Sequence, residues 1–334
     1  MTKAAAKAAP QNPVIAAIKS QMQLIFVMLA LVVVYLYFMF AAPNFAQFGI
    51  FMDILLQAAF MGVMALGATF IIATSGIDLS VGTGMTFVAV SAGFFLSEDA
   101  GKFGLPLVVG LVLTLLVGAC MGFINGVNVS LLGLPPFIAT LAMMMVARGL
   151  SLVLSGSQTI SIKNPGYIAL STGELIPGFT NAALIFIVAA IVAAFLMNKT
   201  LLGRYSIAIG SNEEATRLSG VNVRFWKILI YTVAGIFMAL GAILYSARFG
   251  FVQPAEGIGF ELNVIAAVVI GGTSLAGGRA SIFGTVIGAL LMETLKKGLT
   301  MMGVPSEWQL VVTGIVVLLA VFVDNIRRAR AASV

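Results

Sequence analysis

Residues 203–223 read Gly-Arg-Tyr-Ser-Ile-Ala-Ile-Gly-Ser-Asn-Glu-Glu-Ala-Thr-Arg-Leu-Ser-Gly-Val-Asn-Val and form a polar segment between two long apolar runs. The segment is too polar to cross a bilayer and too long to be a tight turn. Its centre, residues 213–218, predicts a short exposed helix that ends at Gly220, because glycine is a natural helix stop. An ordered helix on one face of a membrane protein indicates a surface that a partner protein grips.

The composition around this segment is that of a membrane protein. The chain has 334 residues, of which 60% are hydrophobic and only 9% are charged. A soluble domain carries roughly 25% charged residues. Apolar runs of nearly membrane-spanning length recur along the whole chain, so the sequence predicts an all-α integral membrane protein. The net charge of +6 does not indicate a nucleic-acid partner, because the basic residues lie between and beyond the apolar runs.

The apolar runs predict about ten transmembrane helices, some of them short or broken by glycine. A helix needs roughly 20 residues to cross the hydrocarbon core, and the third, eighth and tenth runs are shorter than this. The predicted segments are 22–41, 50–74, 80–96, 105–131, 137–155, 181–197, 225–246, 262–275, 281–299 and 308–323.

The distribution of basic residues predicts that both chain ends lie in the cytoplasm. With this orientation most Lys and Arg residues fall on the cytoplasmic side, as the positive-inside rule requires. The domains are then a cytoplasmic tail (1–21), a transmembrane domain (22–325) with a cytoplasmic loop (198–224), and a second cytoplasmic tail (326–334). Lys296 and Lys297 fit this orientation poorly, because they fall near the outer interface.

Several chemistries are excluded by missing residues. The chain has no histidine and a single cysteine, Cys120, in an apolar run. This removes imidazole metal sites, histidine bases and internal disulfides. No phosphate-binding Gly-x-x-x-x-Gly-Lys-Ser/Thr loop is present, so the chain is not expected to bind ATP. We therefore predict neither a catalytic site, nor a metal site, nor a bound cofactor.

Two polar interruptions of apolar runs are candidate parts of a solute pathway. The first holds Ser75, Asp78 and Ser80, and the second holds Thr273 and Ser274. An ionisable residue at membrane depth is a functional candidate, so Asp78 is a candidate gate residue. The alternative is a cytoplasmic turn in which Asp78 or Ser80 caps the next helix. For the second interruption the alternative is close helix packing through small residues.

Two further features leave alternatives open. Arg148 lies about eleven residues into its apolar run, where a charge must face the bundle interior or a wet cavity. Asp53, Glu293 and Glu261 are conceivable partners, and a structural ion pair and a solute contact both remain open. The outer loop 156–180 is either a receiving surface for a soluble partner or a plain connection, and Tyr167 and Phe179 are its candidates for the membrane interface.

The chain resembles the permease subunits of bacterial ABC-type monosaccharide importers (the ribose, xylose, arabinose and galactose group, closest to the ribose type). Residues 203–223 carry the resemblance, which extends in matching order over about residues 40–325. The other matching stretches are Thr74-Ser-Gly-Ile-Asp-Leu-Ser-Val-Gly82, Pro136-Phe-Ile-Ala-Thr-Leu141, Glu261-Leu-Asn-Val-Ile-Ala-Ala-Val-Val-Ile-Gly-Gly-Thr-Ser-Leu-Ala-Gly-Gly278 and Leu319-Ala-Val-Phe-Val-Asp324.

The resemblance implies an ABC importer permease fold in the bacterial inner membrane. It implies a second permease copy in a homodimer, a cytoplasmic ATPase that binds ATP and Mg²⁺, and a periplasmic sugar-binding protein that delivers a monosaccharide. By this resemblance the polar segment contains the helix that docks on the ATPase. The residues assigned to this coupling role are Gly210, Ser211, Asn212, Glu213, Glu214, Ala215, Thr216, Arg217, Leu218, Ser219 and Gly220.

Two rival functions belong to other classes. An ion-driven secondary transporter of a small polar solute would need paired acids or a cation site within the membrane, for which Asp78 and Arg148 are thin support. A membrane enzyme would need catalytic groups that the sequence lacks. The sequence therefore favours a transport subunit that works by alternating access and whose ATP hydrolysis takes place in a partner.

Overall fold

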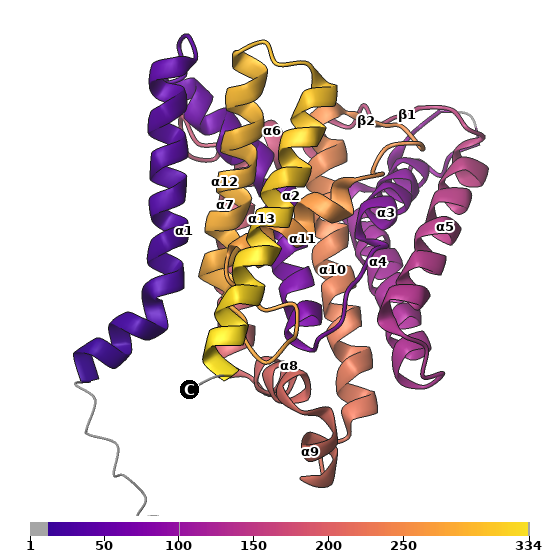
Figure 1. The fold of residues 1–334 in the computed structure, drawn as a ribbon. Helices are drawn as coiled ribbons and strands as arrows, with labels where there is room; N and C mark the ends of the chain where they lie inside the picture. The colour runs from indigo at the N-terminus through magenta and orange to yellow at the C-terminus, as the bar shows by residue number, and fades with distance from the viewer. Residues whose placement is uncertain (1–12, 100, 333–334) are drawn as a thin grey trace, which may run out of the picture.

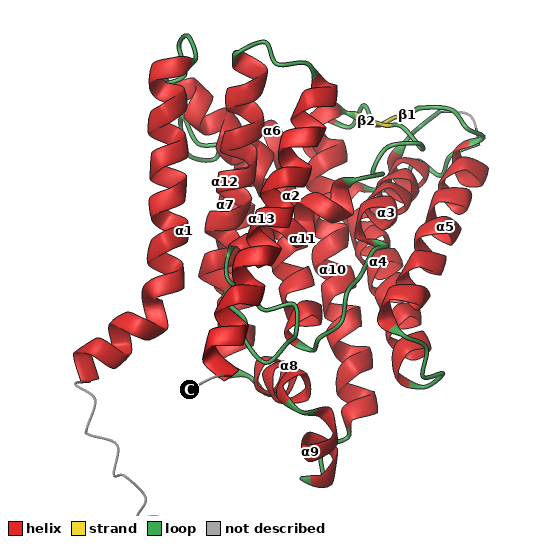
Figure 2. Cartoon of the chain, viewed as in Figure 1, coloured by secondary structure: helices red, strands yellow, loops and turns green. Residues whose placement is uncertain are grey.

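The computed structural model describes residues 13–99 and 101–332, and nearly all of its regular structure is helical (Figures 1 and 2). Two short strands, β1 (Ile160–Ser161) and β2 (Phe251–Val252), pair antiparallel. This confirms the predicted all-α fold. The helices are α1 (Pro13–Ala41), α2 (Phe48–Ala73), α3 (Val81–Leu96), α4 (Leu107–Ser130), α5 (Pro136–Ser155), α6 (Pro165–Thr172), α7 (Asn181–Lys199), α8 (Leu201–Ser211), α9 (Glu213–Leu218), α10 (Val223–Phe249), α11 (Phe260–Ile270), α12 (Ile282–Met301) and α13 (Ser306–Ala332).

Each of the ten predicted apolar segments corresponds to a helix. Within the described residues, six helices are long and apolar enough to cross a membrane, namely α1, α2, α4, α5, α7 and α10. Helices α3 and α11 are short, with 16 and 11 residues, as the sequence predicts. Of the predicted tail 1–21, residues 1–12 lie outside the described residues, and α1 begins within the remainder at Pro13. Helix α13 continues to Ala332, through most of the predicted tail 326–334.

The centre of the bundle is α2, which is buried on all sides over its second half. Helix α10 packs closely against it because small residues face each other. A methyl group on Gly67 would lie 2.7 Å from Cβ of Phe237 and 3.0 Å from the carbonyl oxygen of Ala234. Glycines 118 and 235 permit the same close approach between α4 and α10. Such small-residue contacts let membrane helices approach to van der Waals distance where no hydrophobic effect drives them together.

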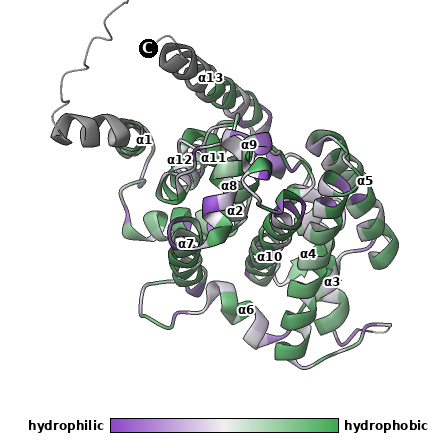
Figure 3. Cartoon of the chain, turned by 90° about the horizontal axis from the view of Figure 1, so that it is seen from below, coloured by the Kyte–Doolittle hydropathy of each residue, from purple (hydrophilic) through white to green (hydrophobic). Residues whose placement is uncertain are grey.

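Hydrophobic residues predominate along the surrounding helices, whereas polar residues gather around α8 and α9 (Figure 3). Many large apolar side chains of the surrounding helices are exposed on the outside of the bundle. Helices α8 and α9 lie at one end of the bundle (Figure 1). The first described turn of α1 and the last of α13 lie at this same end (Figure 1). The β1–β2 pair lies at the opposite end. This arrangement agrees with two cytoplasmic chain ends and a cytoplasmic polar segment.

The outer loop 156–180 is more ordered than a plain connection. Asn164 caps helix α6 by accepting a hydrogen bond from the Tyr167 amide, and Pro165 occupies the first turn, where it needs no amide partner. The expected interfacial position of Tyr167 is wrong. Its side chain is fully buried, and its hydroxyl lies 2.7 Å from Oγ of Ser246 in α10. A buried tyrosine with a satisfied hydroxyl contributes large apolar contact area, and here it joins α6 to the bundle.

The two lysines that fit the orientation poorly have partners at the outer end. Lys297 forms an ion pair with Asp53 of α2, and Arg248 of α10 reaches the other carboxylate oxygen at 3.3 Å. Lys296 lies over the ring of Phe260, 5.9 Å from its centre. Asp53 thus joins α2, α10 and α12, and its paired charge makes the basic residues tolerable near the outer interface.

The orientation predicts opposite labelling of two exposed positions. In a Cys120→Ala background, Ser157→Cys is expected to react with a membrane-impermeant thiol reagent added to the periplasmic face. Glu214→Cys in α9 is the control and is expected to react only after the membrane is opened. Labelling of intact spheroplasts, followed by mass spectrometry, measures both. Reaction of position 214 from outside would contradict the orientation.

Candidate coupling site and buried polar cluster

Helix α9 is a short, exposed element at the end of the bundle where α1 begins and α13 ends (Figure 1). The Asn212 side chain caps it by accepting a hydrogen bond from the Ala215 amide at 2.9 Å. Lys227, at the start of α10, holds Glu213 through an ion pair of 2.7 Å. Thr216 is its one buried residue. After the helix, Gly220 has a φ of +85°, a left-handed conformation that favours glycine. The helix predicted from the sequence is therefore present, with the Asn212 cap at its N-terminal end and the glycine at position 220 after its C-terminal end.

The outward face of α9 carries fixed charges and an apolar side chain. Arg217 donates hydrogen bonds to Glu214 at 2.6 and 3.0 Å, and these lower the pKa of the Glu214 carboxyl and raise the pKa of the guanidinium. Both side chains are exposed, so the ion pair adds little stability and mainly sets the charge pattern of the surface. Leu218 beside them is 76% exposed. An exposed leucine within a rim of paired charges has the character of a protein-docking surface.

Helix α8 connects α9 to the membrane bundle through a junction of three chain segments. The hydroxyl of Ser75, after α2, donates to the carbonyl oxygens of Ala276 at 2.6 Å and Gly210 at 3.3 Å. The amide of Gly278 donates to the carbonyl oxygen of Ala73 at 3.0 Å. The end of α8, the end of α2 and the loop before α12 therefore meet at one point, which we call the glycine junction (residues 73–76, 210–211 and 276–278).

Glycine is required in this junction because the backbones touch. A methyl group on Gly210 would overlap the carbonyl oxygen of Ala73 and lie 2.6 Å from the amide nitrogen of Gly278. Gly277 and Gly278 have φ values of +78° and +74°, and a methyl group on Gly278 would lie 2.6 Å from Oγ of Ser211. Backbone therefore packs directly on backbone at Gly210, and a side chain on this residue could not be accommodated without movement of α8 or its neighbours.

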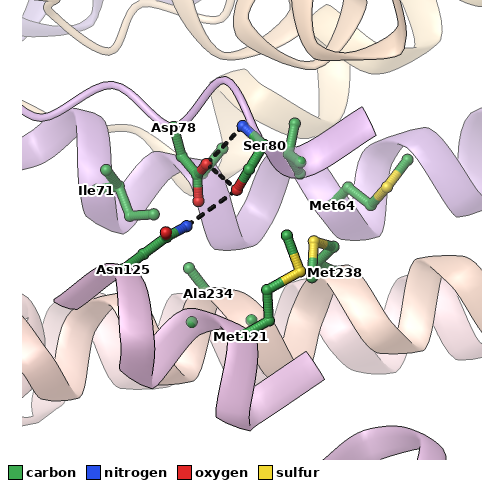
Figure 4. A pocket seen from close by; sticks show the side chains of 12 residues that line it. Met64, Ile71, Asp78, Ser80, Met121, Asn125, Ala234 and Met238 are labelled. Atoms are coloured by element: carbon green, nitrogen blue, oxygen red, sulfur yellow. Dashed lines mark hydrogen bonds between the residues drawn. The ribbon is translucent and has the colours of Figure 1, made fainter. Parts of the chain in front are cut away.

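Asp78 and Ser80 belong to a buried polar cluster that the sequence did not reveal as a unit (Figure 4). The Asp78 carboxylate accepts hydrogen bonds from the amide of Ser80 at 2.8 Å and from its hydroxyl at 2.6 Å. The side-chain amide of Asn125, in α4, donates to the Ser80 hydroxyl at 2.9 Å. Two buried atoms nearby, Oδ1 of Asn125 and the hydroxyl of Tyr231, have no hydrogen-bond partner among the described residues.

The geometry of Asp78 is that of a turn residue before a helix. Its carboxylate accepts from the amide two residues later and so forms an Asx turn, which agrees with the turn in the alternative interpretation. The capping part of that interpretation is wrong, because Ser80 is the N-cap residue of α3 and no side chain makes a cap hydrogen bond there. The adjoining cavity has a volume of about 10 Å³, room for one water molecule and far too little for a monosaccharide. The cluster fastens the segment after α2 to α4.

The second interruption is built from close backbone packing. The hydroxyl of Thr273 accepts from the amide of Ser281 at 3.2 Å, and the amide of Ser274 donates to the carbonyl oxygen of Arg279 at 3.2 Å. Gly284 of α12 lies directly against the backbone of Gly271. These contacts agree with the small-residue alternative, and the structure brings this loop into the glycine junction beside Ser75.

Arg148 has none of its conceivable partners. Asp53 is paired with Lys297 and Arg248, and the Glu261 carboxylate accepts from the Gly259 amide at 3.0 and 3.1 Å. No described residue forms an ion pair or side-chain hydrogen bond with Arg148, and the residue is exposed on the outer face of α5. Of the two alternatives left open by the sequence, the described residues therefore provide no structural ion pair for Arg148.

The residues missed from the sequence are lone polar side chains in apolar runs. Asn125 and Tyr231 carried a signal, since a polar residue in a membrane span seeks a polar neighbour. Their partners were not readable, because helix pairing is tertiary information. Among the described residues no cluster of three or more acidic or cysteine side chains could hold a metal ion.

Comparison with known proteins gives consistent matches. Residues 50–321 match the family described as "Branched-chain amino acid transport system / permease component". The ribose import permease protein RbsC of Escherichia coli (strain K12) is 38% identical over 291 residues, which cover 85% of this chain and 88% of that protein. The galactose/methyl galactoside import permease protein MglC of Salmonella typhimurium is 34% identical over 304 residues (87% and 90%). The probable ABC transporter permease protein YphD of Escherichia coli (strain K12) is 36% identical over 297 residues (89% and 88%). No solved structure matches the chain.

A multi-pass helical bundle with these relatives is a membrane transport permease, a transport subunit rather than an enzyme. The chain belongs to the family of branched-chain amino acid transport system permease components, whose match spans the helical bundle from α2 into α13. The resemblance stated from the sequence is confirmed. The relatives are bacterial import permeases, which agrees with the predicted location in the bacterial inner membrane.

The glycine junction predicts a large effect of a single methyl group. Gly210→Ala is expected to displace α8 and to destabilise the purified protein by roughly 1–3 kcal/mol, the usual cost of overpacking. Gly49→Ala is the matched control, since no described atom lies within 4 Å of a methyl group there. Thermal unfolding in detergent compares the two variants. Equal melting temperatures for Gly210→Ala and the wild type would contradict the described backbone contact.

Proposed function

We propose that this chain is the transmembrane subunit of an ATP-driven monosaccharide importer. The observation that carries the proposal is its similarity over most of its length to permeases named for ribose and galactose import. The exposed helix α9, rigidly connected to the bundle, adds independent support for a permease driven by a partner protein. The sugar is proposed to pass between α-helices by alternating access.

The cytoplasmic partner is proposed to be an ATP-binding subunit that docks on residues 210–220. Leu218 would enter an apolar pocket of this subunit, and the Glu214–Arg217 pair would set the orientation of docking. Interface energy concentrates in a few buried anchors, and an exposed leucine on a rigid helix has the geometry of such an anchor. ATP and Mg²⁺ are proposed to bind in that partner, because the present sequence lacks the phosphate-binding loop.

The remaining partners are proposed to be a second permease copy and a periplasmic sugar-binding protein. Nucleotide binding and the loaded binding protein would each favour one of two conformations of the permease pair. A ligand shifts such an equilibrium only by its difference in affinity for the two states. Movement of α9 would reach Ser75, next to the buried polar cluster, through the glycine junction. Pathway roles for Ser75, Asp78, Ser80, Thr273 and Ser274 remain part of this proposal.

An ion-driven carrier is the alternative and has less support. Such a carrier needs acids that exchange a cation with water during transport. Asp78 is instead engaged by Ser80, and Asp53 is paired with two basic side chains. The matched family is described as a permease component of a transport system, which fits a subunit with partners better than a self-contained carrier.

Sugar uptake into vesicles tests the proposal. The pure chain is expected to hydrolyse no ATP. Vesicles that also contain the proposed ATP-binding subunit and sugar-binding protein are expected to accumulate a monosaccharide only with ATP. Leu218→Asp is expected to abolish uptake and to weaken ATPase association about tenfold or more, because an interface anchor becomes a desolvated charge. Leu218→Met is the control and is expected to retain both. Uptake driven by an ion gradient without ATP would exclude the importer.

A further inference from the structure

Arg148 lies at membrane depth in α5. Twelve residues separate it from Pro136 at the cytoplasmic end, a rise of about 18 Å, and seven residues separate it from Ser155 at the outer end, about 10 Å. The hydrocarbon core is about 30 Å thick. The backbone of Arg148 therefore lies within the hydrocarbon region and closer to its outer boundary.

The side chain leaves the described bundle. Helix α5 packs on α3 and α4 through a narrow buried stripe that includes Thr140, Ala147 and Ser151. Arg148 is exposed, and α5 stands at the edge of the molecule in both views (Figures 1 and 3). No described atom lies within 4 Å of a methyl group built on the next residue, Gly149. The space beside the guanidinium is thus open in the single chain.

Lipid is a poor environment for this guanidinium. A charged side chain in the hydrocarbon core is costly and almost always faces protein or a water-filled cavity. A lipid-facing arginine lowers the cost by extending toward the nearer interface. Helical side chains, however, point toward the N-terminal end of their helix. For α5 this is the cytoplasmic end, so Arg148 points toward the bilayer centre and away from the nearer outer interface.

We infer that the outer face of α5 borders a water-filled pathway whose other wall is a second copy of this chain, and that Arg148 hydrogen-bonds to the hydroxyls of the monosaccharide in it. The sugar part of this inference rests on the proposed function. The guanidinium offers five N–H donors in a planar fork and can donate to two neighbouring hydroxyls.

The symmetry of a two-copy assembly favours a water-filled space over direct packing between the two α5 faces. A twofold axis near α5 places a second Arg148 across from the first. Two unpaired guanidinium groups cannot be buried against each other without a large desolvation penalty. Water or a polyhydroxyl solute between them satisfies their donors. Met145, which is 54% exposed one turn earlier on α5, gives the same wall an apolar surface for the faces of a sugar ring.

Cysteine reactivity tests the position of this face in the assembled transporter. Arg148→Cys in a Cys120→Ala background is expected to react with a charged methanethiosulfonate reagent at least about tenfold faster than Val188→Cys, since only water-exposed thiols ionise and react readily. Val188 is the matched control, being 59% exposed near the middle of α7. Reaction of position 148 only with a lipid-soluble maleimide, or with neither reagent, would overturn the inference.

Substitution that keeps or removes the donors tests the sugar contact. Arg148→Met is expected to lower ATP-dependent uptake of radiolabelled D-ribose about tenfold or more, the effect of losing a charged hydrogen bond. Arg148→Lys, which keeps the charge and loses the fork, is expected to fall between Arg148→Met and the wild type. Membrane content and ATPase association should stay at wild-type levels in both variants.

The outcomes separate this inference from the proposed function. Wild-type uptake by Arg148→Met would overturn the sugar contact while leaving the importer intact. Absence of ATP-dependent uptake of D-ribose and D-galactose by the wild-type protein would instead overturn the proposed importer of these sugars. In that case the reactivity of the thiol at position 148 would still show whether the outer face of α5 is exposed to water.

Discussion

The fold depends on one constraint: backbone polar groups within a membrane must find partners inside the protein. Residues 74–80 leave the helical path beside α4 and α5, and the Thr140 side chain of α5 supplies two of the hydrogen bonds that they need. The Thr140 hydroxyl accepts from the Leu79 amide at 3.1 Å and lies 3.2 Å from the carbonyl oxygen of Ile77. The hydrogen bonds from Ser80 to Asp78 and from Asn125 to Ser80 pair further polar groups of this segment. Irregular backbone is therefore possible here because α4 and α5 cover it.

The same constraint explains why the two broken segments meet. The loop after α2 and the loop before α12 exchange hydrogen bonds through Ser75, Ala276, Ala73 and Gly278. Each loop provides hydrogen-bond partners for polar groups of the other loop. The end of α8 joins them, because the carbonyl oxygen of Gly210 accepts from the Ser75 hydroxyl. The end of α8, which leads directly into the exposed helix α9, therefore lies against the two least regular parts of the membrane domain.

Much of the fold could be predicted from the sequence, because long apolar runs have few other solutions in a bilayer. The helix at Glu213–Leu218 followed from a polar run before a glycine. The rest required tertiary contacts. The burial of Tyr167 depends on its hydrogen bond with Ser246, which is 79 residues away in the sequence. The position of Lys297 is explained by its ion pair with Asp53 of α2, which the sequence does not reveal. The sequence does not indicate which acidic residue would pair with Arg148, and none of the described acidic residues does so in the structure.

Asn212 ends α8 and begins α9 at the same time. Its amide donates to Ala208 in the first helix while its side chain accepts from Ala215 in the second. The two helices therefore share a single residue and have no slack between them. No unstructured linker therefore separates the exposed helix from the helix whose end packs against the crowded backbone at Gly210. The orientation of α9 is thereby tied to that of α8 through the backbone and the side chain of a single residue.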